Sequence, residues 1–325
     1  MEERTKIKTS EVKDLELKKG LKISELVAQF ETGGGFTAKK IALGAKILEN
    51  MLKDKDCIKI LSLPAAPIAT GMRGIVKELV KRKLFDVVIT TCGLLDHDLA
   101  RTFKPYLEGD FALNDTELHK KGLFRLGSVV IPKESYADVI EEKMQALLHT
   151  LVEKGRTSIS SYELSWEIGA SLEKEPNKES SILYWAWKNK IPIFVPGLTD
   201  GAVGSQIWLF SNKTQFKIDP LADEQKLAEL IFDAKKLGAL MIGGGISKHH
   251  TIWWAQFKSG LDYAVYITTA PEWDGSLSGA QTREAISWGK LKERAPHITI
   301  EGEATVLLPL LISAVLDKLD DKTKV

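Results

Sequence analysis

The feature of the sequence that most constrains the fold is a repeated alternation of short apolar runs with amphipathic segments of helical length. The apolar runs are rich in Val and Ile and nearly continuous, which is typical of strands buried on both faces of a sheet. Such strands need helices on each side, and this arrangement favours a parallel sheet. We therefore predict an α/β fold with a doubly wound, mostly parallel, Rossmann-like sheet. The expected strands are Cys57–Leu63, Phe85–Thr91, Leu126–Pro132, Ile191–Pro196, Ala239–Gly245, Asp262–Thr269 and His297–Gly302.

The expected helices lie between these strands and at both ends of the chain. Residues 1–20 alternate in charge without periodic apolar positions, so we expect a flexible or loosely docked arm. No internal repeat, low-complexity tract or long linker interrupts residues 21–325, which predicts a single domain. The expected helices are Leu21–Phe30, Thr37–Lys55, Gly71–Lys83, Tyr136–Lys154, Ser180–Asn189, Ala222–Leu237, His249–Ser259 and Ala304–Leu316.

Charge and cysteine content narrow the class of protein. The 45 Lys and Arg residues nearly balance the 44 Asp and Glu residues, so no overall field favours nucleic acid or a membrane. The longest apolar run, Val306–Leu316, is too short to cross a bilayer. Cys57 and Cys92 lie in apolar runs outside any CxxC pattern, so we expect buried, reduced thiols in a cytoplasmic protein.

One segment, Pro271–Lys290, concentrates the chemistry that binds and attacks amines. Its glycines and serines, among them Gly275 and Ser276, favour a loop whose backbone can approach a ligand. A short helix is predicted from about Thr282, as N-cap, to Trp288, with Gly289 as its left-handed stop.

Lys290 follows that stop and is the candidate nucleophile, because a shielded, neutral lysine attacks carbonyl and imine carbons. Trp273 and Trp288 are expected to wall the site, and Asp274 and Glu284 to hold a cation. The alternative is that Lys290 is an ordinary solvated lysine.

Glycines and acidic residues follow the predicted strands, at the edge where open parallel sheets bind ligands. Glycine there allows backbone amides to reach a pyrophosphate, although the GxGxxG fingerprint is absent. A dinucleotide site is thus one interpretation. The groups are Thr91-Cys92-Gly93, Thr199-Asp200-Gly201, Gly243-Gly244-Gly245, Thr269-Ala270 and Gly302-Glu303-Ala304.

The adjacent histidines His249 and His250 suggest a metal site, but neighbouring side chains diverge and no third ligand recurs at zinc-like spacing. We therefore expect no metal. Acid–base work suits His249 better, and His250 is expected to be structural.

Six blocks of the chain, in order, resemble segments of the deoxyhypusine synthase family. The block WDGSLSGAQTREAISWGK, Trp273–Lys290, resembles the active-site segment of that family. The resemblance covers nearly the whole chain. The other blocks are Asp86–Gly93, Gly122–Pro132, Ile191–Gly204, Gly243–His250 and Asp262–Ala270.

This resemblance implies transfer of the aminobutyl group of spermidine to one lysine of the translation initiation factor 5A precursor. NAD would carry the hydride, Lys290 would hold the four-carbon fragment as an imine, and His249 would lie at the reacting amine. The resemblance also implies a homotetramer with active sites across subunit interfaces. Expected substrate-binding residues are Trp288, Glu284, Asp96, Gly275, Ser276 and Asp274, and expected NAD-binding residues are Thr91, Cys92, Gly93, Asp200, Gly243, Gly244, Thr269, Ala270, Glu303 and Ala304.

The chain departs from the family pattern where acidic residues are usual. Leu277, Ser205 and His97 stand at three such positions, and an unpaired buried ammonium is costly. Ala65–Ala69 also lacks the serine and asparagine that relatives often have there. Two alternatives therefore stay open: an aminobutyltransferase that acts on a small amine such as putrescine, and a noncatalytic NAD-binding partner subunit.

Overall fold

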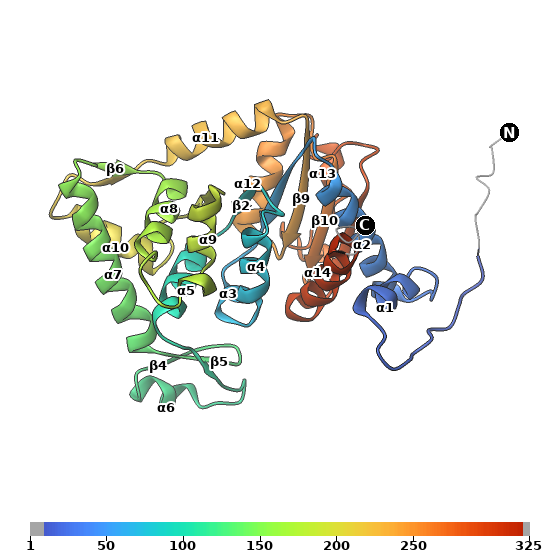
Figure 1. Cartoon of the computed structure of the whole chain (residues 1–325), viewed down its shortest axis with the longest axis horizontal. Coiled ribbons are helices and arrows are strands. Elements are labelled where there is room, and N and C mark those ends of the chain that lie inside the picture. Colours follow the sequence, from blue (N-terminus) through green and yellow to red (C-terminus); the bar gives the residue numbers. More distant parts are fainter. Residues whose placement is uncertain (1–9, 321–325) are drawn as a thin grey trace.

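A computed structural model of the chain describes residues 10–320. Its centre is a six-stranded sheet in the order β11-β10-β9-β1-β2-β7, and every neighbouring pair is parallel (Figure 1). The predicted α/β class with a parallel sheet is confirmed. The strands are β1 (Cys57–Ser62), β2 (Val87–Ile89), β7 (Ile193–Phe194), β9 (Lys236–Ile242), β10 (Tyr263–Thr268) and β11 (His297–Glu301).

Helices cover both faces because successive strand residues point to opposite sides. In β1, Ile60 belongs to one hydrophobic core and Leu61 to the other. The smaller core packs under α11 (Pro220–Asp233) and α12 (Gly245–Gln256). The helices of the larger core are α1 (Ile23–Gln29), α2 (Phe36–Lys53), α4 (Met72–Lys81), α5 (Cys92–Phe103), α7 (Lys133–Glu153), α8 (Ser161–Ser171), α9 (Ile182–Asn189), α10 (Ala202–Ser211) and α14 (Ala304–Asp320).

One predicted strand, Leu126–Pro132, lies outside the parallel sheet. It spans a turn: Leu126 ends one strand, Gly127 has the left-handed φ of 61°, and Val129 begins the next strand. The prediction was wrong because a short apolar run suits an antiparallel hairpin as well as a buried parallel strand. The hairpin consists of β4 (Leu123–Leu126) and β5 (Val129–Pro132), and it projects from the body at the lower left of Figure 1. Two short elements precede it in the same projection: β3 (Leu107–Glu108), which pairs with β5, and the helix α6 (Asp115–Lys120).

The segment Cys92–Asp98, which contains a glycine, is helical. It forms the first half of α5, and its Leu94 and Leu95 are fully buried. Gly93 suggested a break, but burial of this apolar face outweighs the small helix penalty of one glycine. The remaining short elements are α3 (Ala66–Ala69), the paired strands β6 (Ser158–Ile159) and β8 (Lys217–Ile218), and a 3-10 turn at Lys178–Ser180.

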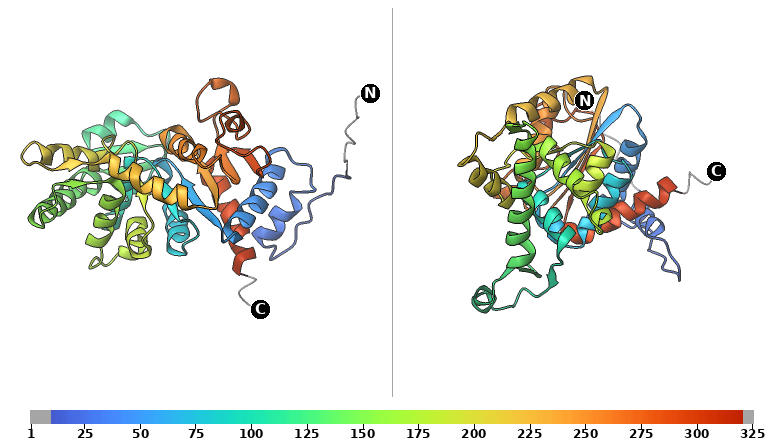
Figure 2. Two further views of the ribbon diagram at one scale, coloured as in Figure 1. Left: turned by 90° about the horizontal axis from the view of Figure 1, so that it is seen from above. Right: turned by 60° about the vertical axis from the view of Figure 1, so that its left-hand side comes forward.

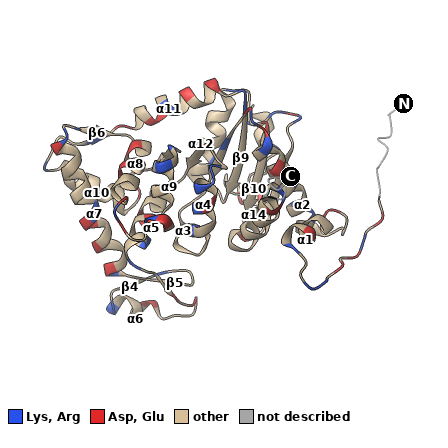
Figure 3. Ribbon diagram, in the orientation of Figure 1, with Lys and Arg blue, Asp and Glu red and all other residues tan. Residues whose placement is uncertain are grey.

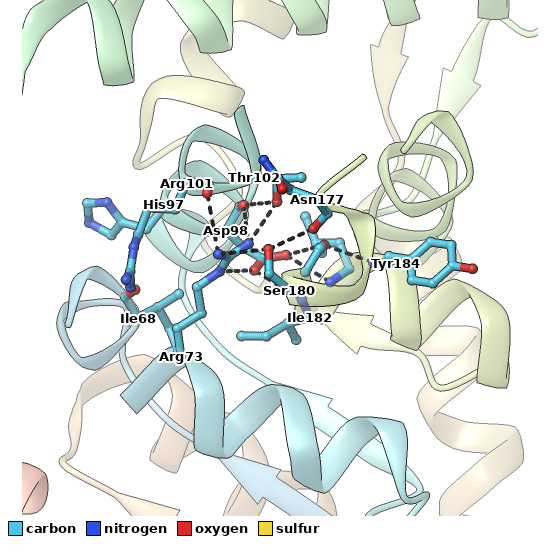
Figure 4. A network of polar contacts seen from close by, with 12 residues as sticks. Ile68, Arg73, His97, Asp98, Arg101, Thr102, Asn177, Ser180, Ile182 and Tyr184 are labelled. Atoms are coloured by element: carbon cyan, nitrogen blue, oxygen red, sulfur yellow. Dashed lines mark hydrogen bonds and ion pairs between the residues drawn. The ribbon is translucent and has the colours of Figure 1, made fainter. Parts of the chain in front are cut away.

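A buried ion pair joins α4, α5 and α9. Arg73 Nε donates to Asp98 Oδ1 at 2.7 Å, and Arg73 also donates to Thr102 (Figure 4). The Asp98 carboxylate accepts as well from the backbone N–H groups of Ile182 and Leu183 at 3.0 and 2.9 Å, so it caps α9. Each charge is thus fully paired, which makes this junction structural.

The N-terminal segment 10–20 contains no helix or strand and contacts the chain after α1, where Lys13 N donates to Thr32 O. Residues 1–9 of the predicted arm lie outside the described residues, and the domain division stays a prediction. Cys57 and Cys92 are free and buried, as predicted.

Charged residues of both signs are spread over most of the elements (Figure 3). Within residues 10–320, no helix is both long and apolar enough to span a membrane. In the same range, no group of three or more His, Cys, Asp and Glu side chains could hold a metal ion.

Candidate active site

A pocket of about 320 Å³ lies against β9 and β10, between α12 and the segment that leads from β10 to β11. That segment stands out from the body in the left view of Figure 2, in orange-red. Most of the lining is apolar: Met241, Ile252, Trp253, Leu261, Ala264, Leu277, Ala280, Ala285, Trp288 and Leu291. The polar lining residues are Lys248, His249, Gln281, Thr282, Glu284 and Lys290.

The backbone fixes Lys290 at the end of this segment. Its N–H donates to Ala285 O at 2.9 Å, and its carbonyl accepts from Leu261 N at 3.1 Å. Gly289, just before it, has a φ of 67°, so the predicted left-handed stop is present.

The side chain of Lys290 is 8% exposed, which confirms the expected shielding. Its Nζ lies 5.1 Å from the ring centroid of Trp288 and 5.6 Å from that of Trp253. Within residues 10–320, this nitrogen has no hydrogen-bond or ion-pair partner. An amine that is held by its backbone and walled by aromatic rings, with its nitrogen unengaged, is suited to attack a carbonyl or imine carbon.

The helix before Lys290 is shorter than predicted: α13 covers Glu284–Ser287, and Arg283 precedes it without a side-chain cap. The predicted N-cap role of Thr282 is wrong. Its hydroxyl lies 2.7 Å from His297 Nδ1, and its N–H donates to Thr299 Oγ1 at 3.0 Å. Thr282 therefore hydrogen-bonds to residues of β11 instead of capping the helix.

His249 and Trp253 share one face of α12, four residues apart. Their rings stack with centroids 5.7 Å apart and planes 24° from parallel. Burial, together with the charge of Lys290, lowers the pKa of His249 below its usual value. His249 is therefore a neutral base near neutral pH.

His250 points elsewhere, with Nε2 3.6 Å from Glu224 Oε1, and burial lowers its pKa to about 4. The neighbouring Trp254 is buried, and its Nε1 donates to the carboxylate of the same glutamate at 3.0 Å.

Several residues predicted for the substrate do not line this pocket. Trp273 is 88% exposed, so it does not form the expected wall; Trp253 does. Asp274 is also exposed and accepts from the N–H of Ser276 at 2.7 Å, within the turn that contains Gly275. Glu284 and Trp288 do line the pocket, as expected.

Asp96, in α5, is buried outside this pocket, and its carboxylate lies at the start of α10. Its carboxylate accepts from Ala202 N at 3.0 Å, Val203 N at 2.8 Å and the Tyr136 hydroxyl at 2.9 Å. Burial raises its pKa. In this chain Asp96 therefore caps α10, and a role in amine binding stays a prediction.

The residues expected to bind NAD follow the carboxyl ends of β2, β7, β9, β10 and β11. A Cβ on Gly93 would lie 2.6 Å from that of Ala65, and Gly243 has a φ of 67°. Gly243 also lies close to Pro64, so a larger residue would be strained or crowded at either glycine. A pocket of about 860 Å³ at the same edge is lined in part by Arg101 and Glu303. The residues in question are Thr91, Cys92, Gly93, Asp200, Gly243, Gly244, Thr269, Ala270, Glu303 and Ala304.

Of the three departures from the family's acidic positions, only Leu277 lines the Lys290 pocket. Ser205 lies in α10 and donates to Gly201 O at 2.9 Å. His97 is largely buried, with Nδ1 2.9 Å from the Tyr106 hydroxyl, and burial lowers its pKa to about 4.

The sequence did not point to Lys248, which also lines the pocket. Its Nζ donates to Leu277 O and Ala280 O, each at 2.7 Å, and lies 3.6 Å from the ring centroid of Tyr266. Burial lowers its pKa to about 7. Its position beside His249 was the only available signal, whereas the helical spacing from His249 to Trp253 could have identified Trp253.

The fold and pocket define a Rossmann-like α/β protein with an unengaged lysine amine in an apolar site. The family model described as deoxyhypusine synthase matches residues 25–315, and the chain belongs to this family. Deoxyhypusine synthases are transferases, so the chain is a transferase.

Two relatives are similar over almost their whole length. The "Probable deoxyhypusine synthase" of Picrophilus torridus is 54% identical over 97% of this chain and 99% of its own. That of Thermoplasma acidophilum is 50% identical over 97% and 100%. A crystal structure of a "putative deoxyhypusine synthase" from Entamoeba histolytica has a TM-score of 0.66 at 21% identity, covering 93% of this chain and 96% of its own, and it shows the shared fold.

Proposed function

We propose that this chain transfers the aminobutyl group of spermidine to one lysine of the translation initiation factor 5A precursor, through an imine on Lys290. Lys290 Nζ attacks the imine carbon of the four-carbon fragment, and 1,3-diaminopropane leaves. The acceptor lysine then displaces Lys290, which returns to its free amine. The product is deoxyhypusine, and the reaction takes place in the cytoplasm, with the factor.

The observation that carries this proposal is the contrast between the two lysines of the pocket. Lys248 Nζ is engaged by two carbonyl oxygens, whereas Lys290 Nζ has no hydrogen-bond or ion-pair partner in the described part of the chain. Only Lys290 is therefore available as a nucleophile.

The carboxyl edge of the sheet, where β2, β7, β9, β10 and β11 end in segments rich in glycine, is the place where open parallel sheets bind dinucleotides. Gly243, Gly244, Thr269, Ala270, Glu303 and the other predicted residues at this edge would hold NAD. Bound there, NAD would supply reversible hydride transfer at the carbon beside the secondary amine of spermidine, with no net redox change over the reaction.

The remaining pocket residues support the chemistry of Lys290. His249, with its lowered pKa, can take a proton from the incoming amine and later return it. Glu284 is the pocket's one carboxylate and would hold an ammonium of the substrate. Trp253 and Trp288 are 44% and 67% exposed, so a second subunit of the proposed homotetramer would have to cover them to keep water from hydrolysing an imine.

A second acceptor is favoured by Leu277, which puts an aliphatic side chain into the pocket where a carboxylate could pair with an ammonium. Because Leu277 changes the amine-binding wall, the second candidate is transfer to a small amine such as putrescine, which would give homospermidine. Homotetramer assembly, with a second subunit that completes each site, is part of both proposals.

The test is incubation of the enzyme with spermidine, NAD and both acceptors in competition, followed by mass spectrometry. We expect the factor precursor to gain one aminobutyl group. Labelled putrescine with an unmodified precursor would instead support the small-amine reaction. Modification of neither acceptor would contradict both and favour a noncatalytic partner subunit.

A further inference from the structure

We infer that Lys248 is a positioning residue: by binding two backbone carbonyls it fixes the roof of the Lys290 pocket. The roof is defined here as residues 277–282, of which four line the pocket. The consequence for activity rests on the proposed function, whereas the attachment of the roof does not.

Three side chains beneath the roof hold its backbone. Lys248, in α12, donates to the carbonyls of Leu277 and Ala280. From β10, the hydroxyl of Tyr266 donates to Ser278 O, and Thr268 Oγ1 donates to the same oxygen at 2.9 Å. Three roof carbonyls are thus bound by side chains of the sheet and of α12.

Close packing leaves the roof little freedom to settle elsewhere. A Cβ on Gly244, the residue before α12, would lie 2.5 Å from Ser278 Cα, so the roof rests directly on this glycine. Leu277 adds apolar packing against the smaller core, while the hydrogen bonds to the roof carbonyls fix its backbone, so removing a donor should loosen it.

The geometry also explains why Lys248 is not a second nucleophile. Even a neutral amine has only two N–H groups, and both are directed to the carbonyls of Leu277 and Ala280. The remaining side of Nζ faces the ring of Tyr266 at 3.6 Å. Among ionisable neighbours, Glu284 of α13 favours the charged form of Lys248. Lys248 is 4% exposed, so water does not replace these partners.

A loosened roof would admit water to the imine and misplace the substrate. We therefore expect Lys248→Met, which removes the donor but keeps the length of the side chain, to affect both the roof and the reaction. Lys248→Arg retains donors for two carbonyls. Lys258→Met is the matched control, because Lys258 also donates to a backbone carbonyl, Phe232 O at 2.9 Å, but outside the pocket.

The first measurement is hydrogen–deuterium exchange of the full-length protein, which needs no assumption about its reaction. Lys248→Met should raise the exchange of the roof amides by about tenfold or more, with Lys258→Met unchanged there. Lys248→Arg should recover most of the protection. Wild-type exchange of the roof in Lys248→Met would overturn the inference.

The second measurement is transfer kinetics with the acceptor that the wild type modifies. We expect Lys248→Met to lower kcat/KM by about tenfold or more, with KM for the amine raised as well, and Lys248→Arg to restore part of it. A looser roof with wild-type kinetics would overturn the positioning role. If the wild type modifies no acceptor, the proposed function fails, while the exchange result still decides whether Lys248 holds the roof.

Should Lys248→Met fail to fold, the wild type itself provides a test. Reductive methylation followed by mass spectrometry should label Lys248 at least about tenfold more slowly than Lys258, because its Nζ is engaged and buried. Equal labelling rates would contradict the inference.

Discussion

Two buried ionic side chains, Asp98 and Lys290, have opposite surroundings. The Asp98 carboxylate is paired with Arg73 and accepts from the backbone of α9 as well as from Ser181. The backbone of Lys290 is also held by hydrogen bonds, but within residues 10–320 its Nζ lies near aromatic rings and has no hydrogen-bond or ion-pair partner. Full pairing serves stability, whereas an unengaged buried group is available for chemistry. The surroundings of the two groups thus distinguish a structural junction, at Asp98, from a reactive site, at Lys290.

The largest effect is expected on transfer activity, when Lys290 is replaced. Lys290→Ala should lower transfer by about 10³-fold or more while the thermal melting temperature stays near that of the wild type, because the side chain has no partner to lose. Lys292→Ala is the control: this lysine pairs with Asp262 at 2.7 Å outside the pocket. Normal transfer by Lys290→Ala would refute the role of this nitrogen.

The structural side should respond in the opposite way. Asp98→Ala is expected to lower the free energy of unfolding by about 3–5 kcal/mol, since it leaves Arg73 buried and unpaired. Urea denaturation measures this change. Asp115→Ala, which removes an exposed partner of Arg125, should change stability little. A small effect at Asp98 would mean that the junction does not hold α9 in place.

A smaller effect is expected at the contact between the roof and α12. Gly244→Ala places a Cβ against Ser278 and should cost about 1–3 kcal/mol of stability or displace the roof, with a matching loss of kcat/KM. Gly74→Ala, in α4 with no neighbouring atom within 4 Å of its Cβ, should be neutral or slightly stabilising. Equal tolerance at both positions would show that the roof does not rest on Gly244.

The last expected effect is a dependence of stability on pH. Burial lowers the pKa of Lys248 to about 7, against about 10.4 in an unfolded chain. Below pH 7 both states carry the proton and the folded state bears the full cost of the buried charge. Between about pH 7 and 10.4 only the unfolded state keeps the proton, so the free energy of unfolding rises with pH.

Urea denaturation at several pH values, on the wild type and on Lys248→Met, measures this rise. The variant should show a flatter dependence, since the other titrating groups are common to both proteins. An identical dependence would mean that Lys248 keeps its proton in the folded protein over this range.

Much of the fold was predictable because its strands are buried on both faces and so leave a strong apolar pattern, as in Ala239–Ile242. Elements that depend on distant partners were not. Thr282 hydrogen-bonds to His297 of β11 instead of capping a helix. The segment Leu126–Pro132 contains a turn at Gly127 instead of forming one strand.

The candidate site shows the same limit. Lys290, His249, Trp288 and Glu284 come together as expected, because they belong to the segment and helix that the sequence had singled out. Trp253 and Lys248 line the pocket because of the orientation of α12. Trp273, next to the turn at Gly275, is exposed outside the pocket. A local sequence pattern reveals neither placement.

The most direct test of the central claim is reduction of the working enzyme with borohydride in the presence of spermidine and NAD, followed by peptide mass spectrometry. We expect one added aminobutyl group on Lys290, none on Lys248, and none anywhere without NAD. An adduct on another lysine, or transfer to the acceptor without any trapped adduct on Lys290, would contradict it.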